Sequence, residues 1–401
     1  MPIADPPTEM LVLDAFVSLC GREPWQARLA DLGARANPGS LCGRATQQRY
    51  ALELALSRLT DHRAAAKAGP AERRLCGLAR DAVALADSLP PAARTRLQDQ
   101  LLAGLTGEAT LIPLFHLLRT ASILRSRGFA VRFDGLAEDA PYDLLIERGG
   151  ATAEVVCETV SAEEGRPVPR GDWWALVDAI NPELQTWLAA HPGRYLLKMT
   201  LPEGMSGPDQ LAELQRRITD LLAAEKRQDS GAQAVLKLDP LMLAGAQAGD
   251  RAGGLPARLR AQFGPEAHLA VTADPGSGSV FALAARAGRE NAIAAAVCRR
   301  AALVAESRLT GAHPGILAIF LEDLDRTDWQ VLRGEQLELE GAVRRFLTTA
   351  PARRVVAVSC TSRFEMFGAS DGVPEGELRF RNPSHAASKA PGLAPAILSS
   401  V

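Results

Sequence analysis

The segment from Leu111 to Leu201 constrains the fold more than any other part of the chain, because it combines helical periodicity with a hairpin signal. Apolar residues recur at helical spacing until Gly128, and Gly149-Gly150 then separates two runs that favour strands. The expected elements are a helix at Leu111–Arg127, a strand at Phe129–Phe133, paired strands at Tyr142–Glu147 and Ala151–Thr159, a helix at Trp173–Ala190 and a strand at Tyr195–Leu201. This order predicts an α/β fold in which a mixed sheet is flanked by helices.

The rest of the chain divides into segments with different patterns. Residues 1–105 contain only runs with helical spacing, which predicts an N-terminal all-helical domain. Residues 106–205 are the expected core, and residues 206–383 alternate strand and helix patterns as an α/β extension of it. Residues 384–401 are rich in Ala, Pro and Ser, so we expect a flexible tail there.

Composition and charge exclude several classes of protein. A chain of 401 residues with 47% hydrophobic and 23% charged residues is typical of a globular protein of two or three domains. The net charge of -2 argues against a protein dominated by nucleic-acid electrostatics, although it is compatible with a local basic groove. The six cysteines are scattered singly, which indicates neither a zinc knuckle nor a redox dithiol. Neither a signal peptide nor a membrane span is evident, so we expect a cytoplasmic protein without a membrane partner.

Carboxylates are placed on both strands of the expected hairpin. Asp143 begins the first strand, and Glu154 and Glu158 lie on the second. Residues at even spacing in a strand share a face, so Glu154 and Glu158 should point to the same side of the sheet. Converging carboxylates of this kind bind Mg²⁺, and metal-dependent phosphodiester hydrolysis adds a group, often Lys, that activates water. The alternative is a strand-start Asp beside a solvent-facing stripe of Glu.

The segment Leu114–Ser161 resembles the PD-(D/E)xK, or restriction-endonuclease-like, nuclease superfamily. Arg125–Phe133 is similar to the helix-glycine-strand entry of that superfamily, and Ala140–Gly150 is similar to its first motif, with Asp143 at the metal-ligand position. Ala153–Ser161 is similar to its second strand, as that strand is written in uncharacterised bacterial members. The resemblance implies a restriction-endonuclease-like mixed sheet, with Asp143 and Glu154 as ligands of Mg²⁺.

The chain departs from the superfamily at the residues that carry its chemistry. In one alignment the motif acid is replaced by Val156 and the motif Lys by Glu158. In the other alignment Glu154 supplies the acid, and the Lys is still missing. The resemblance therefore implies a degenerate site, in which Asp143, Glu154 and Glu158 are the candidate catalytic residues.

Lys198 is the candidate replacement for the missing Lys, because the strand that carries it follows the hairpin and the next helix. The alternative is a lysine that merely lies on a sheet face. His116 is the nearest polar residue on the preceding helix, and its apolar surroundings predict a core histidine.

A basic and aromatic group follows the candidate site, formed by Arg166, Arg170, Trp173 and Trp174. Such residues are candidates for nucleic-acid binding, with the arginines on phosphates and the tryptophans on bases. The alternative is that both tryptophans begin an amphipathic helix and pack on the sheet.

These features predict a nucleic-acid-binding protein with a degenerate, inactive nuclease-like site. Two alternatives stay open: an active Mg²⁺-dependent nuclease with a rearranged site, and a non-catalytic structural or regulatory interaction protein. A protein partner or a homo-oligomer is compatible with each of them. The N-terminal helices also carry basic residues, among them Arg63 and Lys67, which we expect to be solvated. The alternative is that these helices form a module that binds a partner or nucleic acid.

Overall fold

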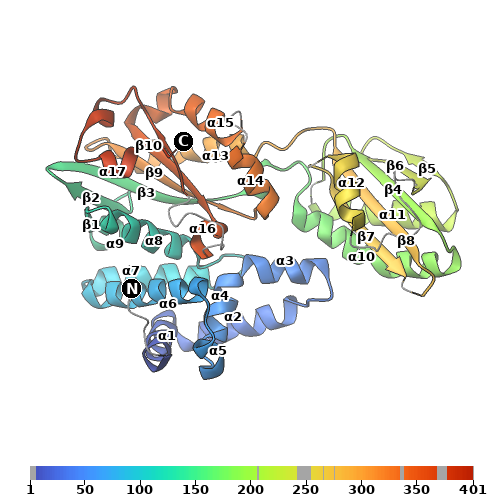
Figure 1. The fold of residues 1–401 in the computed structure, drawn as a ribbon, viewed down its shortest axis with the longest axis horizontal. Helices are drawn as coiled ribbons and strands as arrows, with labels where there is room; N and C mark the ends of the chain where they lie inside the picture. The colour runs from blue at the N-terminus through green and yellow to red at the C-terminus, as the bar shows by residue number, and fades with distance from the viewer. Residues whose placement is uncertain are drawn as a thin grey trace. The chain divides into compact units, whose positions relative to one another are not determined.

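The computed structural model describes residues 6–205, 207–241, 254–264, 266–274, 276–334, 338–367 and 377–400, so parts of the segments 206–383 and 384–401 lie outside the described residues. The fold is α/β, with two mixed sheets flanked by helices (Figure 1). The chain forms two compact units. Unit 1 comprises Met1–Arg35, Thr46–Glu164 and Ile293–Val401, and unit 2 comprises Ala36–Ala45 and Gly165–Ala292.

Unit 1 contains a six-stranded sheet with the order β1-β2-β3-β9-β10-β11. The central pairs β3·β9 and β9·β10 are parallel, and the outer pairs are antiparallel. The strands are β1 (Ala130–Arg132), β2 (Leu144–Arg148), β3 (Ala151–Ser161), β9 (Gly315–Glu322), β10 (Val355–Ser362) and β11 (Leu378–Arg381). The hairpin prediction is confirmed: Gly149 and Gly150 turn between β2 and β3 with φ of 57° and 77°, which glycine adopts without a steric cost.

Helices cover both faces of this sheet (Figure 1). On one face, α8 packs with Leu144, Ile146 and Val155 in an apolar core. On the other face, α13 and α15 pack with Val156 and Val160 in a second core. From residue 106 on, the helices of unit 1 are α8 (Ile112–Ser126), α9 (Asp134–Ala137), α13 (Ile293–Arg308), α14 (Arg326–Gly334), α15 (Leu339–Phe346), α16 (Arg363–Phe367) and α17 (Ala394–Ile397), with 3-10 turns η1 (Ala162–Gly165), η3 (Ala350–Arg354) and η4 (Ala386–Lys389).

The N-terminal part is helical, as expected. Its helices are α1 (Pro6–Cys20), α2 (Arg22–Arg35), α3 (Leu41–Arg49), α4 (Ala51–Arg58), α5 (His62–Ala66), α6 (Pro70–Ser88) and α7 (Pro91–Gly104). However, Phe16, Trp25 and Leu97 share one apolar core with α8 and the sheet. The predicted domain boundary at residue 105 is therefore not where the compact units divide, because these helices and the sheet bury their apolar faces together.

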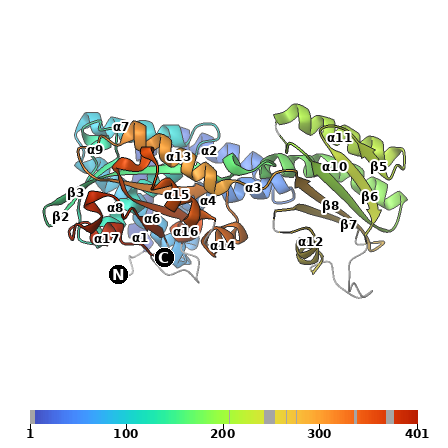
Figure 2. The same cartoon turned by 90° about the horizontal axis from the view of Figure 1, so that it is seen from above.

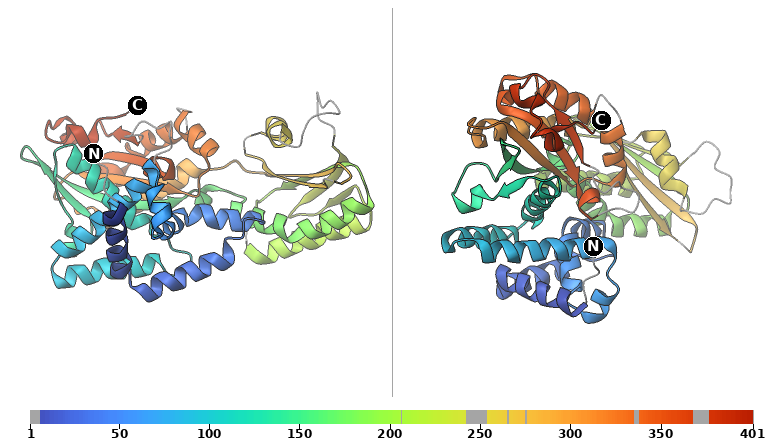
Figure 3. Two further views of the ribbon diagram at one scale, coloured as in Figure 1. Left: turned by 60° about the horizontal axis from the view of Figure 1, so that its bottom comes forward. Right: turned by 60° about the vertical axis from the view of Figure 1, so that its left-hand side comes forward.

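Unit 2 contains a five-stranded sheet with the order β5-β6-β4-β8-β7. Its α10 and α11 lie on one face and α12 on the other (Figures 2 and 3). The elements are α10 (Arg170–Ala190), β4 (Arg194–Leu201), α11 (Gly207–Ala223), β5 (Gln228–Ser230), β6 (Val235–Pro240), α12 (Leu255–Phe263), β7 (His268–Asp274) and β8 (Ser279–Ala287).

The division into units corrects the predicted core of residues 106–205. The helix and strand expected to complete that core are α10 and β4, and both belong to unit 2. The neighbour of β3 is instead β9, which is buried along nearly its whole length and pairs with β3 from Glu154 to Ser161. Unit 2 is thus inserted between β3 and α13.

The C-terminal segment is also different from the prediction. Its Ala- and Pro-rich composition predicted a flexible tail, but Leu393 and Ile397 are buried in the core of unit 1. The hydroxyls of Ser399 and Ser400 accept hydrogen bonds from the amides of β11 at 3.1 and 2.8 Å. Among the described residues, no helix has the length and apolar character needed to cross a bilayer.

Candidate functional site

The hairpin places the predicted acidic residues on one face of the sheet. Leu145 pairs with Glu154, and the amide of Asp143 continues the ladder by donating to the carbonyl of Val155 at 3.0 Å. Side chains alternate along each strand, so Asp143, Glu154 and Glu158 all point to the face covered by α13. The three carboxylates therefore share one face of the sheet, and their chemistry depends on which other side chains contact them there.

Arg308, at the end of α13, lies between two of these carboxylates. Its Nη2 donates to Asp143 Oδ1 at 2.7 Å, and its Nη1 lies 3.5 Å from Glu158 Oε2. The same guanidinium donates through Nε to the carbonyl of Pro141 at 2.9 Å and through Nη1 to the carbonyl of Cys157 at 3.4 Å. A planar guanidinium suits such a set of oxygen acceptors, so Arg308 is a fixed internal cation beside the hairpin.

Both oxygens of the Asp143 carboxylate are engaged by protein donors. Its Oδ2 accepts the amide of Cys157 at 2.7 Å, while Oδ1 accepts from Arg308. Burial raises the pKa of Asp143, and the opposing effects of Arg308 and of the Cys157 amide are smaller. Burial also raises the pKa of Glu158, against the attraction of Arg300 and Arg308.

Glu154 is separated from this pair by its own contacts. Its side chain is 0% exposed, Oε2 accepts the amide of Thr310 at 2.9 Å, and Oε1 accepts the Thr310 hydroxyl. Its own amide donates to the carbonyl of Pro314 at 2.9 Å. Glu154 therefore fixes the loop that leads from α13 into β9, and its carboxylate does not join that of Asp143 at a common ligand.

This donor set does not fit a bound Mg²⁺. The ion needs several oxygen ligands at close range, but Asp143 and Glu158 are engaged by a guanidinium and Glu154 by Thr310. Across the part of the chain that the structure describes, no group of three or more His, Cys, Asp or Glu side chains is placed to hold a metal ion.

Lys198 is not placed as the sequence predicted. It lies on β4, in the sheet of unit 2, whereas Asp143 belongs to unit 1. Its Nζ donates to Asp239 Oδ2 at 3.0 Å across the β4–β6 pair, on a half-exposed sheet face. The reason for the error is that β4 pairs with β6 and β8, so the strand that follows the hairpin in sequence is not its neighbour in the sheet.

The candidate nucleic-acid residues around α10 are placed in unit 2 and are mostly covered. Trp173 is 2% exposed and packs in the apolar core, and Trp174 packs against the same core. Arg166 is 7% exposed, so it is also largely covered by protein. Base stacking on Trp173 is therefore excluded by its burial, and the alternative of an amphipathic helix packed on the sheet is correct for this residue.

His116 is a core histidine, as expected. Its ring is buried on α8, and Nε2 lies 2.9 Å from the carbonyl oxygen of Ala318 on β9. Burial is the main cause that lowers the pKa of His116 to about 4, so the ring is neutral at neutral pH. The ring packs against the face of the sheet opposite to that of Asp143, so it is separated from the acidic residues by the sheet.

The residues that sequence reasoning missed are Arg308 and Thr310. Each lies far along the chain from the hairpin, beyond unit 2, and neither belongs to a recognisable motif. The only local signal was that Arg308 ends a long helix, which a short loop separates from a continuously apolar strand. Comparison of the chain with protein-family models, with curated proteins and with solved structures found no match.

Proposed function

We propose that this chain is a nucleic-acid-binding protein built on a restriction-endonuclease-like core that has lost nuclease activity. The order of elements in unit 1 supports the core. With unit 2 as an insertion, α8, β1, the β2–β3 hairpin, α13 and β9 follow one another as helix, strand, hairpin, helix and strand. This is the order that the resemblance implies, now supplied by α13 and β9.

The contacts of Arg308 support the loss of catalysis. A nuclease site of this kind needs carboxylates that can share a divalent ion and a group that activates water. In this chain a side chain of fixed positive charge is held by Asp143 and Glu158, and Lys198 belongs to the other unit. The arrangement stabilises the hairpin without offering open coordination positions.

The observation that carries nucleic-acid binding is a concentration of arginines in the layer formed by α13, α15 and η3. α13 carries three arginines and one glutamate, α15 two arginines and one glutamate, and η3 two arginines and no acid. These elements pack together over one face of the sheet, where α13 and α15 lie side by side (Figure 2). In a chain of net charge -2, this is a strong local excess of positive charge.

Most of these arginines are exposed. We call the exposed set the arginine face, and its members are Arg299, Arg344, Arg345, Arg353 and Arg354. Arg344 pairs with Glu340 at 2.7 Å, but the side chains of Arg345 and Arg353 make no hydrogen bond or ion pair with any residue that the structure describes. Guanidinium groups of this kind bind phosphates and favour a polyanionic partner over an apolar one.

A salt titration with a labelled DNA duplex and a labelled single-stranded RNA tests this proposal. We expect binding that weakens steeply with salt, since phosphate contacts release counterions. The double variant Arg345→Gln/Arg353→Gln should lower the salt slope by about two and weaken binding to all sequences alike. The matched control is Arg63→Gln/Lys67→Gln, which removes the same charge from exposed positions near α5 and should bind as the wild type does.

The same samples, incubated with Mg²⁺ or Mn²⁺, separate the alternatives. We expect bound nucleic acid to remain intact. Cleavage by the wild type that is lost in Asp143→Ala would replace the proposal with an active nuclease. Absence of binding at low salt would instead favour a structural or regulatory interaction protein, and loss of binding in the control variant alone would move the interface to the N-terminal helices.

A further inference from the structure

Among the strands that the structure describes, β7 is the longest one at the edge of a sheet. The edge strands are β1 and β11 in unit 1 and β5 and β7 in unit 2. β1 and β5 have three residues each and β11 has four, whereas β7 has seven. The amides of β11 are also covered, because they donate to the hydroxyls of Ser399 and Ser400. An uncovered edge is a template for pairing with another chain, so β7 is the strand to consider.

The backbone groups that β7 directs outward follow from its pairing with β8. The amide of Val280 in β8 donates to the carbonyl of Gly193, on the side of β4, at 2.9 Å. Backbone groups alternate in direction along a strand, so Phe281 is directed towards β7, where its partner is Thr272. The even-numbered residues of β7 are therefore bonded to β8, and the odd-numbered ones point away from it. These outward residues, whose amides and carbonyls make no hydrogen bond with any described residue, are Leu269, Val271 and Ala273.

The outward groups of β7 are complementary to themselves. When two copies of the strand run antiparallel about a two-fold axis at Val271, this residue pairs with Val271 of the second copy, and Leu269 pairs with Ala273 of the second copy. In each of these pairs the two residues exchange both of their hydrogen bonds. Three pairs with two hydrogen bonds each give six, and no outward backbone group of the strand is left without a partner.

The side chains of β7 suit the same register. Leu269 and Val271 pack against the apolar cluster beside α12, so the axis brings two valines together on this face, and cross-strand pairs of β-branched residues stabilise a sheet. The two ionisable residues of the strand, His268 and Asp274, are at its opposite ends. The register places each of them across from the other, so like charges do not meet.

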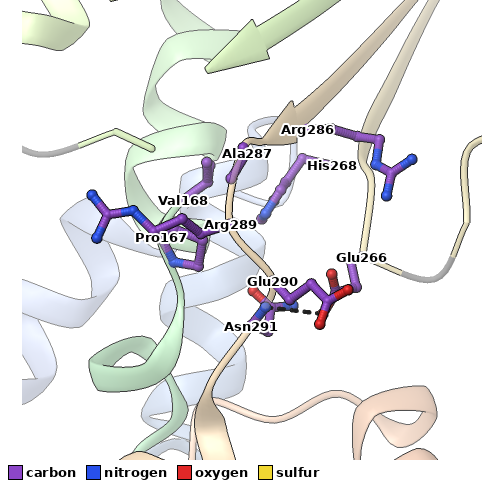
Figure 4. Close-up of a pocket in the computed structure, with 10 residues that line it drawn as sticks. Pro167, Val168, Glu266, His268, Arg286, Ala287, Arg289, Glu290 and Asn291 are labelled. Carbon is purple, nitrogen blue, oxygen red and sulfur yellow. Dashed lines mark hydrogen bonds between the residues drawn. The ribbon is translucent and has the colours of Figure 1, made fainter. Parts of the chain in front are cut away.

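The strand also lacks the features that usually protect an edge from pairing, which are lysines, prolines and inward-pointing charges. From His268 to Asp274 there is no Lys, Arg or Pro. The ring of His268 lies in a small cavity lined also by Val168 and Ala287 (Figure 4), and burial is the largest cause that lowers its pKa to about 4, so it is uncharged at neutral pH. The carboxylate of Asp274 is directed to its own loop, where it accepts the hydroxyl of Ser277 at 2.6 Å.

We propose that two copies of this chain associate through β7, in a two-fold dimer whose sheet continues from one copy into the other. The strands pair antiparallel, with Val271 at the axis. A second copy fits this edge better than an unrelated extended peptide, because the outward groups are symmetric about Val271 and the ends of the strand are complementary. The proposal goes beyond nucleic-acid binding and does not depend on the arginine face or on the hairpin.

Sedimentation velocity of the full chain, over a range of micromolar concentrations, tests the proposal. We expect a monomer–dimer equilibrium. Ala273→Lys places a charge at an exposed position of this edge and should weaken dimerisation about tenfold or more. Gln228→Lys adds the same charge at an exposed position of β5, the other edge of the same sheet, and should leave dimerisation unchanged. Thermal unfolding of both variants checks that the fold is retained.

Cysteine cross-linking tests the register independently of these variants. Val271→Cys places two thiols across the axis with Cα atoms about 5.5 Å apart, which a disulfide can span. In Ala273→Cys the two Cα atoms are about 14 Å apart, because each lies two residues from the axis, and a disulfide cannot form. After mild oxidation we expect a covalent dimer from Val271→Cys alone, above the background that the wild type gives with its six cysteines.

Several outcomes would overturn the proposal. A monomer at every concentration excludes self-association, and equal dimerisation of Ala273→Lys and the wild type excludes this edge. Loss of the dimer in Gln228→Lys alone would assign the contact to β5 instead. Equal cross-linking of Val271→Cys and Ala273→Cys would contradict the symmetric register.

Discussion

The guanidinium of Arg308 donates to the carboxylate of Asp143 at 2.7 Å, although the two residues lie on opposite sides of unit 2 in the sequence. The contact occupies the position at which the resemblance to nucleases implies a metal ion. The ion pair therefore holds the hairpin, and its removal should lower the free energy of unfolding of the protein.

Removal of the internal cation should destabilise unit 1. Arg308→Met keeps most of the side-chain volume but leaves Asp143 and Glu158 without their partner, which should cost about 2 kcal/mol, less than for a fully buried pair because Arg308 is partly exposed. Denaturant unfolding measures the change. Arg299→Met, on an exposed position of the same helix, should cost less than about 0.5 kcal/mol. Equal costs for the two variants would contradict the assigned role.

Divalent ions should not stabilise the wild-type protein. Asp143 and Glu158 already share Arg308, so a melting curve recorded with millimolar Mg²⁺ or Mn²⁺ should agree within about 1 °C with one recorded in chelator. Asp143→Asn serves as the control for binding elsewhere. A metal-dependent rise in melting temperature that this substitution abolishes would show that Asp143 binds the ion after all.

Glu154 and Thr310 should be energetically coupled. Both oxygens of the buried carboxylate accept hydrogen bonds from Thr310, so Glu154→Gln and Thr310→Val each break part of the same contact. A double-mutant cycle should give a coupling of about 1 kcal/mol or more. The cycle of Thr310→Val with Glu147→Gln, at an exposed position of β2, should give none. A coupling of the same size in both cycles would mean that it does not come from the Glu154 contact.

The stability of the protein should fall as the pH is lowered from about 6.5 to 4. The pKa of His116 is lowered from 6.5 to about 4 in the folded state, so in this range the unfolded chain binds a proton that the folded protein does not. The free energy of unfolding then decreases by about 1.4 kcal/mol per pH unit for this group as the pH falls. His116→Gln keeps a donor for the carbonyl of Ala318 and removes the titrating ring. It should therefore reduce the slope of the unfolding free energy against pH by about 1.4 kcal/mol per pH unit, the contribution of one proton. An unchanged slope would refute the burial-induced shift.

The local parts of the fold were accessible from the sequence. The glycine pair at 149–150 and the alternating strands around it fix the hairpin, and Asp143 and Glu154 fall on the predicted face because the side-chain period of a strand is two. By contrast, β4 looked like a core strand, since nothing in its residues distinguishes a partner β9 from a partner β8. Partner choice is a long-range property, and local patterns do not encode it.

The errors at the candidate site have the same origin. Lys198 was assigned to the site because its strand follows the hairpin in the sequence. Arg308 was overlooked because all of the segment Gly165–Ala292 separates it from Asp143 in the sequence. The C-terminal segment was misjudged from composition, although its few large apolar residues, Leu393 and Ile397, are enough to anchor it. In each case contacts with residues distant in the sequence overrode a reasonable local expectation.

The pairing of β3 with β9 also sets an order of events during synthesis. The strand β3 is complete early, but its parallel partner follows only after all of unit 2 has been made. Until then the nascent hairpin has an unpaired apolar edge, which is the kind of surface that associates with other chains. Such distant pairing slows folding, because the loop must close before its contacts form. Unit 2 therefore has time to fold first, and the sheet of unit 1 is completed last, when β9 pairs with β3.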